Sequence, residues 1–349
     1  MIRLKNVLQD PKALYIVGEI SCNHDHNLNT ILKTIDGLVE VGADAVKIQT
    51  DAIDGSGSTM DFRTPYFTIQ GGTIWDGANL MDLYKEAYTP LEWHRPIFDY
   101  CAKRGIECFS TPYSDATIDF LKDYDMPAVK VASMEAGDLP FVRRCAEMGL
   151  PIIISTGMVD LEGARQAVQA CHAAGNQDVI LLKCVSEYPA AVEDMELAAI
   201  PMLRDQLDVV VGLSDHTVNH ISAIVATALG AQVIEKHVKL DNKISGPDAT
   251  FSLTIDEFGE MVNQCRDAQA SLGQGHMRAK QVNVAYSRSI FVIQDVAMGD
   301  EITRENVRVI RPGHGMSPND LNSVLGRSFS QAVSAGHPLL AEHVNDGSY

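Results

Sequence analysis

Two histidines in this chain, His216 and His237, each follow directly on a short apolar segment. A pair of imidazoles suits a divalent transition metal that keeps open positions for water and substrate. Manganese is the metal we expect first, with cobalt or magnesium as alternatives. The competing interpretation is that each histidine is a hydrogen-bonded structural residue. We expect two further histidines, His24 and His26 of NHDHN, to line a pocket or to serve the structure.

Two lysines, Lys47 and Lys130, interrupt segments that are otherwise apolar. A lysine that points into a protein interior is costly unless an anion meets it. With neighbouring hydroxyls and loop amides, the two lysines favour a site for a phosphate and a carboxylate. The alternative is that Glu19 or Glu135 neutralises them. The hydroxyls near the ends of the apolar segments are Ser110, Thr111, Ser133, Ser155 and Ser214.

The carboxylates Glu19 and Glu135 follow different apolar segments and are candidates for acid–base work or for binding substrate hydroxyls. Neutralisation of a lysine is an equally good interpretation for Glu19 and a weaker one for Glu135. We expect Cys184 to pack rather than to act as a nucleophile, because no histidine adjacent in sequence would activate it.

These residues are spaced by a repeating pattern of strand-length apolar segments and longer amphipathic stretches. Eight such units indicate a (β/α)8 TIM barrel, whose catalytic groups lie at the C-terminal ends of the strands. A doubly wound open sheet is the alternative, but no GxGxxG loop follows the first segment. The predicted strands are 13–20, 44–49, 106–110, 128–133, 151–156, 178–184, 208–214 and 231–237.

One connection, residues 50–88, breaks this pattern. It is rich in glycine and aromatic residues, and a loop this long inside a compact domain is usually functional. It follows the second strand, so we expect it to cover the site. Its residues Tyr66, Phe67, Ile74 and Trp75 would either give the site an apolar surface or simply pack the loop. Further along, the pattern predicts a barrel domain over 1–272, a linker over 273–286 and a small β-rich domain over 287–349.

The composition limits the function. Of 349 residues, 46% are hydrophobic, and 28 Lys and Arg against 46 Asp and Glu give a net charge of −18. That balance argues against nucleic-acid or anionic-membrane partners, which need a basic face. No apolar run approaches the ~18 residues of a membrane span. The seven cysteines are scattered without a CxxC pair, so we expect a reducing cytoplasm.

Several of these segments, taken together and in order, resemble the sialic acid synthase family of phosphoenolpyruvate-condensing enzymes. The C-terminal segment 288–315 resembles that family's antifreeze-like (SAF) domain. The similarity covers nearly the whole chain. The matching pieces are VGEISCNHDHNL (17–28), GADAVKIQT (42–50), CFSTPYS (108–114), VKVASMEAGD (129–138), ISTGM (154–158), LLKCVSEYP (181–189), GLSDHT (212–217), IEKHVKLD (234–241) and GPDATFSL (246–253).

Within the family, the stretch 71–94, the SMEAGD segment and the ATFSL ending resemble the pseudaminic acid synthase branch. The tripeptide GPD (246–248) is closer to the N-acetylneuraminate and legionaminate branches. The resemblance implies condensation of phosphoenolpyruvate with 2,4-diacetamido-2,4,6-trideoxy-altrose. The products would be a nonulosonic acid and phosphate, formed by C–O cleavage. A metal on His216 and His237 would polarise the aldehyde, and Glu135 would steer water to C2.

The resemblance also assigns binding roles. Glu19, Tyr188 and Asp248 would contact the sugar, and Arg311 of RPGHG would contact its N-acetyl group. The family further implies a homodimer in which the C-terminal domain covers the partner's barrel. Residues that would hold phosphoenolpyruvate are Lys47, Thr111, Lys130, Ser133, Ser155, Ser186 and Ser214.

Two other classes stay open from the residues alone. One is a barrel aldolase that forms a Schiff base on Lys130 or Lys47. The other is a non-catalytic protein that binds a sugar or an anion.

Overall fold

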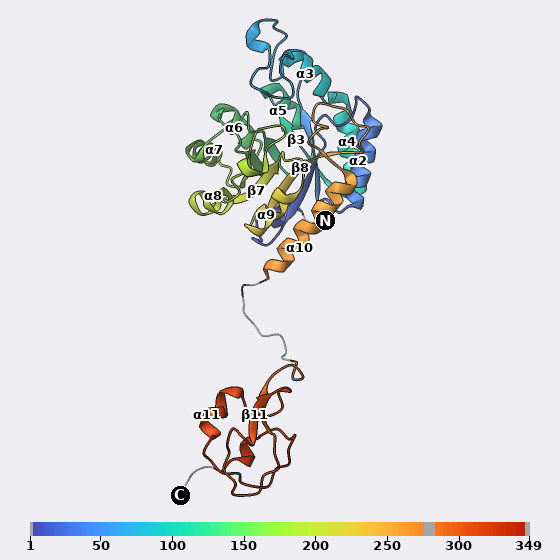
Figure 1. Cartoon of the computed structure of the whole chain (residues 1–349). Coiled ribbons are helices and arrows are strands. Elements are labelled where there is room, and N and C mark those ends of the chain that lie inside the picture. Colours follow the sequence, from blue (N-terminus) through green and yellow to red (C-terminus); the bar gives the residue numbers. More distant parts are fainter. Residues whose placement is uncertain (1–2, 274, 276–282, 346–349) are drawn as a thin grey trace. The chain divides into compact units, whose positions relative to one another are not determined.

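The structure is a computed structural model that describes residues 3–273, 275 and 283–345. It divides the chain into two compact units, Met1–Gly273 and Gln274–Tyr349 (Figure 1). Most of the predicted linker, residues 274 and 276–282, lies outside the described residues, as do the last four of the predicted second domain.

The first unit is a closed barrel of parallel strands, as the sequence predicts. Each strand pairs with the next, and β8 pairs with β1 to close the barrel. A two-residue strand, β9 (Leu253–Thr254), pairs in parallel with the last two residues of β8. The barrel strands are β1 (Tyr15–Glu19), β2 (Ala45–Thr50), β3 (Glu107–Pro112), β4 (Val129–Val131), β5 (Ile152–Ser155), β6 (Val179–Cys184), β7 (Val210–Asp215) and β8 (Val233–Lys239).

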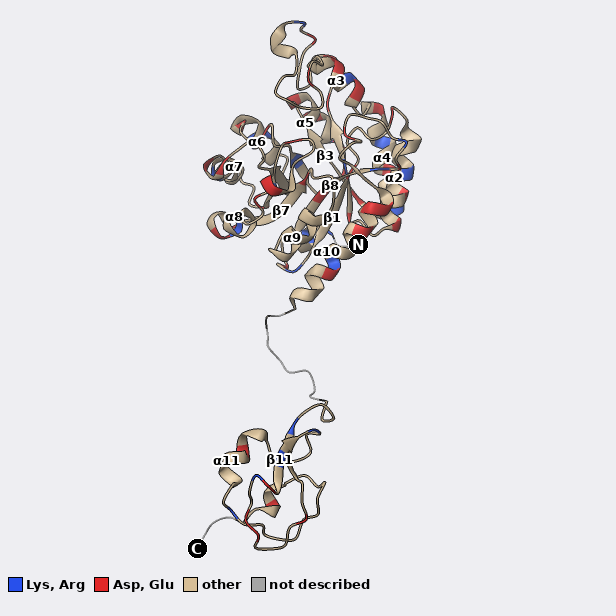
Figure 2. Ribbon diagram, viewed as in Figure 1, with Lys and Arg blue, Asp and Glu red and all other residues tan. Residues whose placement is uncertain are grey.

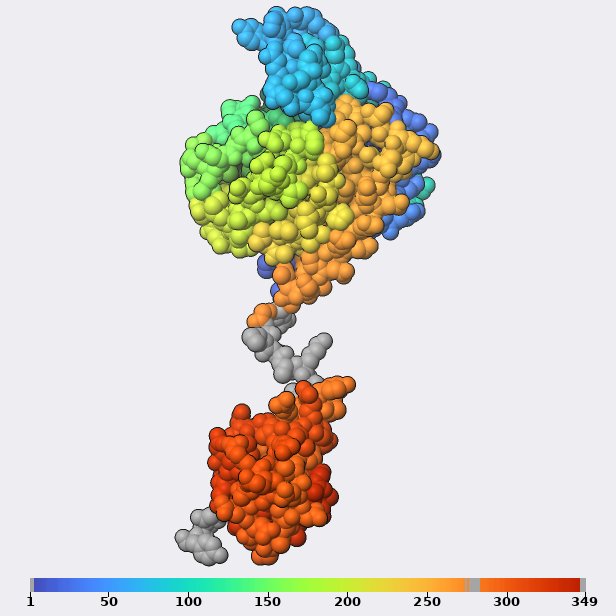
Figure 3. Space-filling view, viewed as in Figure 1, coloured from blue at the N-terminus to red at the C-terminus, as the bar shows by residue number. Residues whose placement is uncertain are grey.

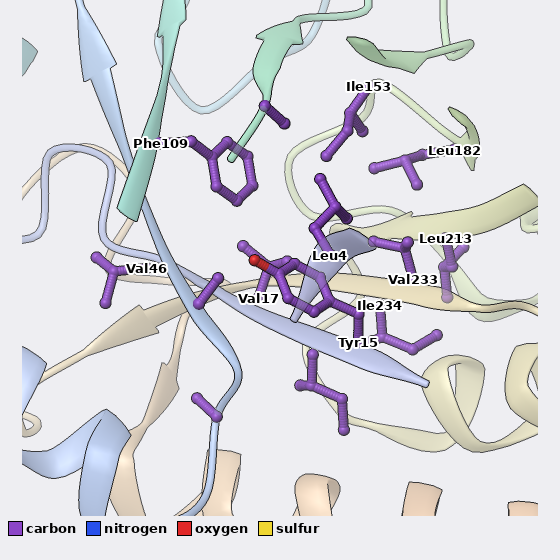
Figure 4. Close-up of a cluster of buried hydrophobic side chains, with 14 of the residues drawn as sticks. Leu4, Tyr15, Val17, Val46, Phe109, Ile153, Leu182, Leu213, Val233 and Ile234 are labelled. Atoms are coloured by element: carbon purple, nitrogen blue, oxygen red, sulfur yellow. The ribbon is translucent and has the colours of Figure 1, made fainter. Parts of the chain in front are cut away.

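The strands are nearly continuous apolar runs because both of their faces are buried. Inside the barrel, Tyr15, Phe109 and Leu182 belong to one cluster of buried side chains (Figure 4). The short helix α1 (Leu4–Val7) adds Leu4 to this cluster. Tyr15 and Leu4 fill the N-terminal end of the barrel, where the Tyr15 hydroxyl donates to Glu107 Oε2 at 2.8 Å.

Helices surround the barrel, and many of the charged residues belong to them (Figure 2). Side-chain caps begin several of them; Asn27, for example, accepts a hydrogen bond from the backbone of Asn29 at the start of α2. Within the described ranges, no helix is long and apolar enough to cross a membrane. The helices are α2 (Leu28–Glu40), α4 (Leu91–Arg104), α5 (Asp115–Leu121), α6 (Leu139–Ala146), α7 (Leu161–Ala173), α8 (Ala199–Leu207), α9 (Ile221–Ala228) and α10 (Ile255–Leu272).

The connection after β2 is only partly a loop. It contains a short 3₁₀ turn, η1 (Pro65–Phe67), and ends in helix α3 (Leu80–Ala87), which the sequence interpretation took as part of the loop. Between them, residues 68–79 form a hairpin-like turn, in which Thr68 and Asn79 make an antiparallel bridge. The segment projects from the barrel as the light blue region of Figure 3.

The second unit has its own core, which includes Ile290, Phe329 and Leu339. Its two strands, β10 (Ser289–Val292) and β11 (Val307–Ile310), are antiparallel. Isolated bridges and the short helix α11 (Leu321–Val324) complete it.

Candidate active site

A cavity of about 380 Å³ opens among the C-terminal ends of the barrel strands. Three predicted site residues, Glu19, Thr111 and Ser186, do not line it, and Arg311 belongs to the second unit. Those that line it are Lys47, Lys130, Ser133, Glu135, Ser155, Tyr188, Ser214, His216, His237 and Asp248.

Lys47 lies between two buried carboxylates. Its Nζ is 3.1 Å from Glu19 Oε2 and 3.2 Å from Glu235 Oε1, and it donates to Thr111 Oγ1 at 3.2 Å. Burial alone would lower the pKa of Lys47, but the two carboxylates raise it above its usual value. Lys47 therefore stays charged. Glu235 was missed by the sequence interpretation, although its spacing of two from His237 puts both side chains on one face of β8.

Lys130 has a different environment. Its Nζ donates to the carbonyl oxygen of Val131 at 2.8 Å and to Ser155 Oγ at 2.7 Å. None of the ion pairs found in the described part of the chain involves it. Burial lowers the pKa of Lys130 to about 8. This lysine is therefore the cation best placed to be stabilised by an incoming anion.

Ser133, Ser186 and Gly157 form a tight cradle beside Lys130. The backbone N–H of Gly157 donates to Ser133 Oγ at 3.1 Å. A Cβ on Gly157 would come within 2.2 Å of Ser186 Oγ and 2.9 Å of Ser133 Oγ, so only glycine allows this approach. The Ser186 hydroxyl is buried and has no hydrogen-bond partner among the described residues. Gly157, absent from the predicted site, belongs to the ISTGM segment.

The two histidines come together. Their ring centroids are 5.3 Å apart, and both rings line the cavity. His216 Nδ1 lies 2.8 Å from the carbonyl oxygen of Val185. Because a carbonyl oxygen only accepts, Nδ1 carries the hydrogen and Nε2 keeps a lone pair in the neutral ring. The nearest carboxylate to His237 Nδ1 is Asp248, whose Oδ2 is 3.4 Å away.

This arrangement fits a catalytic metal. A carboxylate or carbonyl beside one ring nitrogen is the usual way in which a protein orients a metal-binding imidazole. Across the ranges that the structure describes, no group of three or more His, Cys, Asp or Glu is placed to hold an ion. The two-histidine set would leave positions for water and substrate.

Asp248 is itself held in place. Ser21 Oγ donates to its Oδ2 at 2.5 Å, and Ser252 Oγ donates to its backbone carbonyl oxygen at 2.6 Å. Cys184 also lies in this region, with Sγ 3.8 Å from His216 Nδ1. Cys184 therefore has a histidine neighbour, which comes from the next strand and not from adjacent sequence.

The two candidate acid–base carboxylates differ in position. Burial raises the pKa of Glu135 to about 7, and its Oε2 is buried without a hydrogen bond from any described residue. Burial also raises the pKa of Glu19 to about 7, against the opposing charge of Lys47. Glu19 accepts from Gln49 Nε2 at 3.2 Å and lies behind Lys47. Its geometry fits the alternative role of neutralising that lysine.

The connection after β2 reaches the cavity through residues that sequence reasoning largely missed. An apolar surface from Tyr66, Phe67, Ile74 and Trp75 was one expectation, and only Trp75 of these lines the cavity. Tyr66 is 93% exposed and Ile74 is 49% exposed. The helical spacing of residues 80–87 was the signal that could have revealed Leu80, Leu83 and Ala87. The apolar residues of this segment that line the cavity are Ile69, Trp75, Leu80, Leu83 and Ala87.

The remaining predicted residues are not among those that line the cavity. His24 and His26 do not line it; their rings contact each other at 5.6 Å, and His24 packs on Trp93 at 5.7 Å. Arg311, in the second unit, is exposed, and its Nε donates to the carbonyl oxygen of Tyr286 at 2.7 Å.

A closed (β/α)8 barrel whose polar residues gather at the C-terminal mouth has the architecture of a barrel enzyme. Family models match the NeuB family over residues 34–277 and the SAF domain over residues 287–345. The chain belongs to the NeuB family.

Curated relatives and a solved structure agree. The chain is 40% identical to pseudaminic acid synthase from Campylobacter jejuni, covering 94% of this chain and 96% of that one. It is 32% identical to N,N'-diacetyllegionaminic acid synthase from Legionella pneumophila, over 95% and 94%. The crystal structure of N-acetylneuraminic acid (sialic acid) synthetase from Leptospira borgpetersenii is 25% identical, with a TM-score of 0.68 over 78% of this chain and 89% of that one.

Proposed function

We propose that this enzyme condenses phosphoenolpyruvate with 2,4-diacetamido-2,4,6-trideoxy-altrose, the reaction of a pseudaminic acid synthase. The observation that carries the proposal is a single cavity that is lined both by two lysines, Lys47 and Lys130, and by two histidines whose rings come together. The sequence identity of 40% to a pseudaminic acid synthase, against 32% to a legionaminic acid synthase, favours this sugar.

The lysines and hydroxyls at the strand ends would hold phosphoenolpyruvate. Lys130 forms no ion pair among the described residues, and Lys47, which lines the same cavity, adds a second charge. The hydroxyls of Ser133, Ser155 and Ser214 line the same cavity. Thr111 contacts Lys47, and Ser186 contributes to the glycine cradle. Charge-assisted bonds from such groups are the strong ones for phosphate and carboxylate.

His216 and His237 would hold a divalent metal, manganese before cobalt or magnesium. When bound, the metal acts as a Lewis acid toward the aldehyde oxygen of the sugar. C3 of phosphoenolpyruvate forms the new bond to the aldehyde carbon, and water adds at C2. Glu135, as carboxylate, would orient that water and take its proton. Rupture of the bond from C2 to the bridging oxygen then releases phosphate.

Tyr188 and Asp248 line the cavity beside the histidines and would position the sugar. Glu19 would act mainly through Lys47. We further propose that the enzyme is a cytoplasmic homodimer, in which Arg311 of the partner's second unit contacts the N-acetyl group. Arg311→Ala would then lose activity while its unfolding temperature stays unchanged. Normal turnover by this variant would contradict the cross-subunit role.

A phosphate-release assay with phosphoenolpyruvate and a panel of acetamido sugars tests the proposal. We expect release with the diacetamido altrose and little with N-acetylmannosamine. Comparable rates with the two sugars would contradict the branch assignment, in favour of the N-acetylneuraminate or legionaminate alternative.

One observation favours a second reaction class. A buried lysine whose pKa falls to about 8, as burial does for Lys130, is typical of Schiff-base enzymes. Borohydride in the presence of a carbonyl substrate would trap such an imine on Lys130. The synthase reaction needs no imine, so we expect no trapping and a loss of activity with EDTA.

A further inference from the structure

The cavity has two unlike walls. The strand ends contribute lysines, hydroxyls and histidines, whereas the connection after β2 contributes a group of apolar side chains, with the polar Asp51, Tyr84 and Tyr88 also lining the cavity. We call four of these side chains the apolar wall; they are Ile69, Trp75, Leu80 and Leu83.

Local hydrogen bonds fix the first half of the wall. The backbone of Ile69 donates to Ala78 at 2.9 Å and accepts from Gly77 at 2.9 Å. The Asp76 carboxylate accepts from the N–H groups of Gly72 at 2.8 Å and Thr73 at 3.0 Å, which closes the turn. Ile69 and Trp75 are therefore presented by a hairpin with a defined backbone.

The second half of the wall comes from helix α3. Asn79 caps this helix by accepting from the N–H of Met81 at 3.0 Å. Leu80 and Leu83 are three residues apart, so they lie on the same side of the helix. The hairpin runs directly into α3, and the two halves therefore form one continuous surface.

The apolar wall is joined to the histidines by stacked rings. The Trp75 ring centroid is 5.3 Å from that of Tyr188, and the Tyr188 centroid is 4.3 Å from that of His216. A sugar whose aldehyde carbon lies near the histidines would thus extend along Tyr188. Its far end would meet the apolar wall.

We propose that the apolar wall selects sugars whose terminal carbon, C6, is a methyl group rather than a hydroxymethyl group. This inference rests on the proposed function, whose substrate is 6-deoxy. A methyl group gains by burial against such a surface. A hydroxyl beside Ile69, Leu80 or Leu83 loses its hydrogen bonds to water and gains no partner from these side chains. Trp75 Nε1, buried without a hydrogen-bond partner among the described residues, is the one donor of the wall.

The test compares two isoleucines of the same connection. Ile69 lines the cavity, whereas Ile74 does not and is 49% exposed. For wild type, Ile69→Ser and Ile74→Ser, kcat/KM for phosphate release would be measured with the 6-deoxy diacetamido altrose and with its 6-hydroxy analogue. We expect wild type to prefer the 6-deoxy sugar by roughly tenfold or more. Ile69→Ser should lower this preference about fivefold, and Ile74→Ser should leave it unchanged.

A second variant, Leu83→Ser, covers the case in which Ile69→Ser does not fold, as judged by thermal unfolding. A lowered preference in either folded wall variant supports the inference. An unchanged preference in the folded variants, or an equal fall in Ile74→Ser, would overturn it while the proposed function stands. A wild-type enzyme that uses N-acetylmannosamine but not the 6-deoxy sugar would overturn the proposed function, and this inference with it.

Discussion

The strand ends hold their side chains by buried contacts, whereas the connection after β2 holds its own by turns and exposed hydrogen bonds. Lys47, for example, is enclosed by Glu19 and Glu235, both nearly inaccessible to solvent. In the connection, Arg63 and Asp82 form an ion pair in which both side chains are more than half exposed. Buried pairs fix geometry because breaking them is costly, and exposed pairs contribute little.

This difference suggests a division of labour. The strand ends carry the groups that the proposed condensation needs for any sugar substrate. The connection carries the groups that would distinguish one sugar from another, and it can change without disturbing the barrel. Substitutions on the two sides should therefore differ in kind: those at the strand ends should affect stability and turnover, and those in the connection should affect substrate preference.

The largest effect is expected at Lys47. Lys47→Met leaves Glu19 and Glu235 buried without their shared cation. We expect the free energy of unfolding to fall by about 3 kcal/mol and phosphate release to fall more than ~1,000-fold. Chemical denaturation and the phosphate assay would measure both. Lys183→Met on β6 is the matched control, because within the described residues Lys183 forms no ion pair and donates to the carbonyl oxygen of Cys184. Wild-type stability in Lys47→Met would refute the shared-cation arrangement.

A smaller effect is expected at Asp248, which lies beside His237 Nδ1. Asp248→Asn removes the carboxylate charge that orients the imidazole, so the affinity for Mn²⁺ should fall about 10- to 100-fold. Equilibrium dialysis with the metal would measure this directly. Asp241→Asn, in the same loop but bonded to the backbone of Lys243, should leave the affinity unchanged. Equal affinities in the two variants would remove the orienting role from Asp248.

Replacement of Glu135 by glutamine should raise the stability of the enzyme and lower its activity. Burial raises its pKa from 4.5 to about 7, so the folded state keeps this proton to a higher pH than the unfolded state. The stability that Glu135 contributes is therefore full below pH 4.5 and is lost as pH rises through about 7. Glu135→Gln cannot lose a proton, and we expect it to be about 2 kcal/mol more stable than wild type at pH 8 but equal at pH 4.

The same variant should be less active, by about 100-fold, because an amide does not take a proton from water. Wild-type kcat/KM should fall as pH drops below about 7, where Glu135 becomes protonated. Denaturation curves and pH–rate profiles would test both halves. A Glu135→Gln enzyme that is less stable than wild type at pH 8 would show that burial of the ionised Glu135 carboxylate does not destabilise the folded state.

The smallest effect is expected at the exposed end of the connection. Tyr66 is 93% exposed and does not line the cavity. Tyr66→Ala should change kcat/KM less than twofold and the free energy of unfolding by less than about 0.5 kcal/mol. Steady-state kinetics and thermal unfolding would check this. A tenfold loss would mean that this part of the connection contacts the substrate.

The barrel was predictable because its strands are short apolar runs with polar ends. Each predicted strand overlaps an observed one, and His237, the last residue of the eighth predicted strand, lies on β8 two residues before its end. Of the two partners of Lys47, Glu19 was an expected alternative, but Glu235 was harder to foresee, because it lies on β8, on the other side of β1 from β2. Contacts between strands distant in sequence depend on closure and register, which residue types alone do not specify.

The connection was least predictable. Of the expected residues only Trp75 belongs to the apolar wall, and Ile69, Leu80 and Leu83 complete it in place of Tyr66 and Phe67. Which side of an irregular segment faces the cavity depends on its turns, here on Asp76 and Asn79, rather than on a repeating pattern. Helix α3 carried a helical spacing, but it was too short to stand out inside a glycine-rich stretch.

The most direct test of the account follows the bridging oxygen of phosphoenolpyruvate. With ¹⁸O in the bond between C2 and phosphorus, attack of water at C2 and rupture of the C–O bond would carry the label into phosphate. We predict labelled phosphate whose release requires both the acetamido sugar and a divalent metal. Label retained in the keto acid, or phosphate released without the sugar, would contradict the proposed chemistry of the strand-end site.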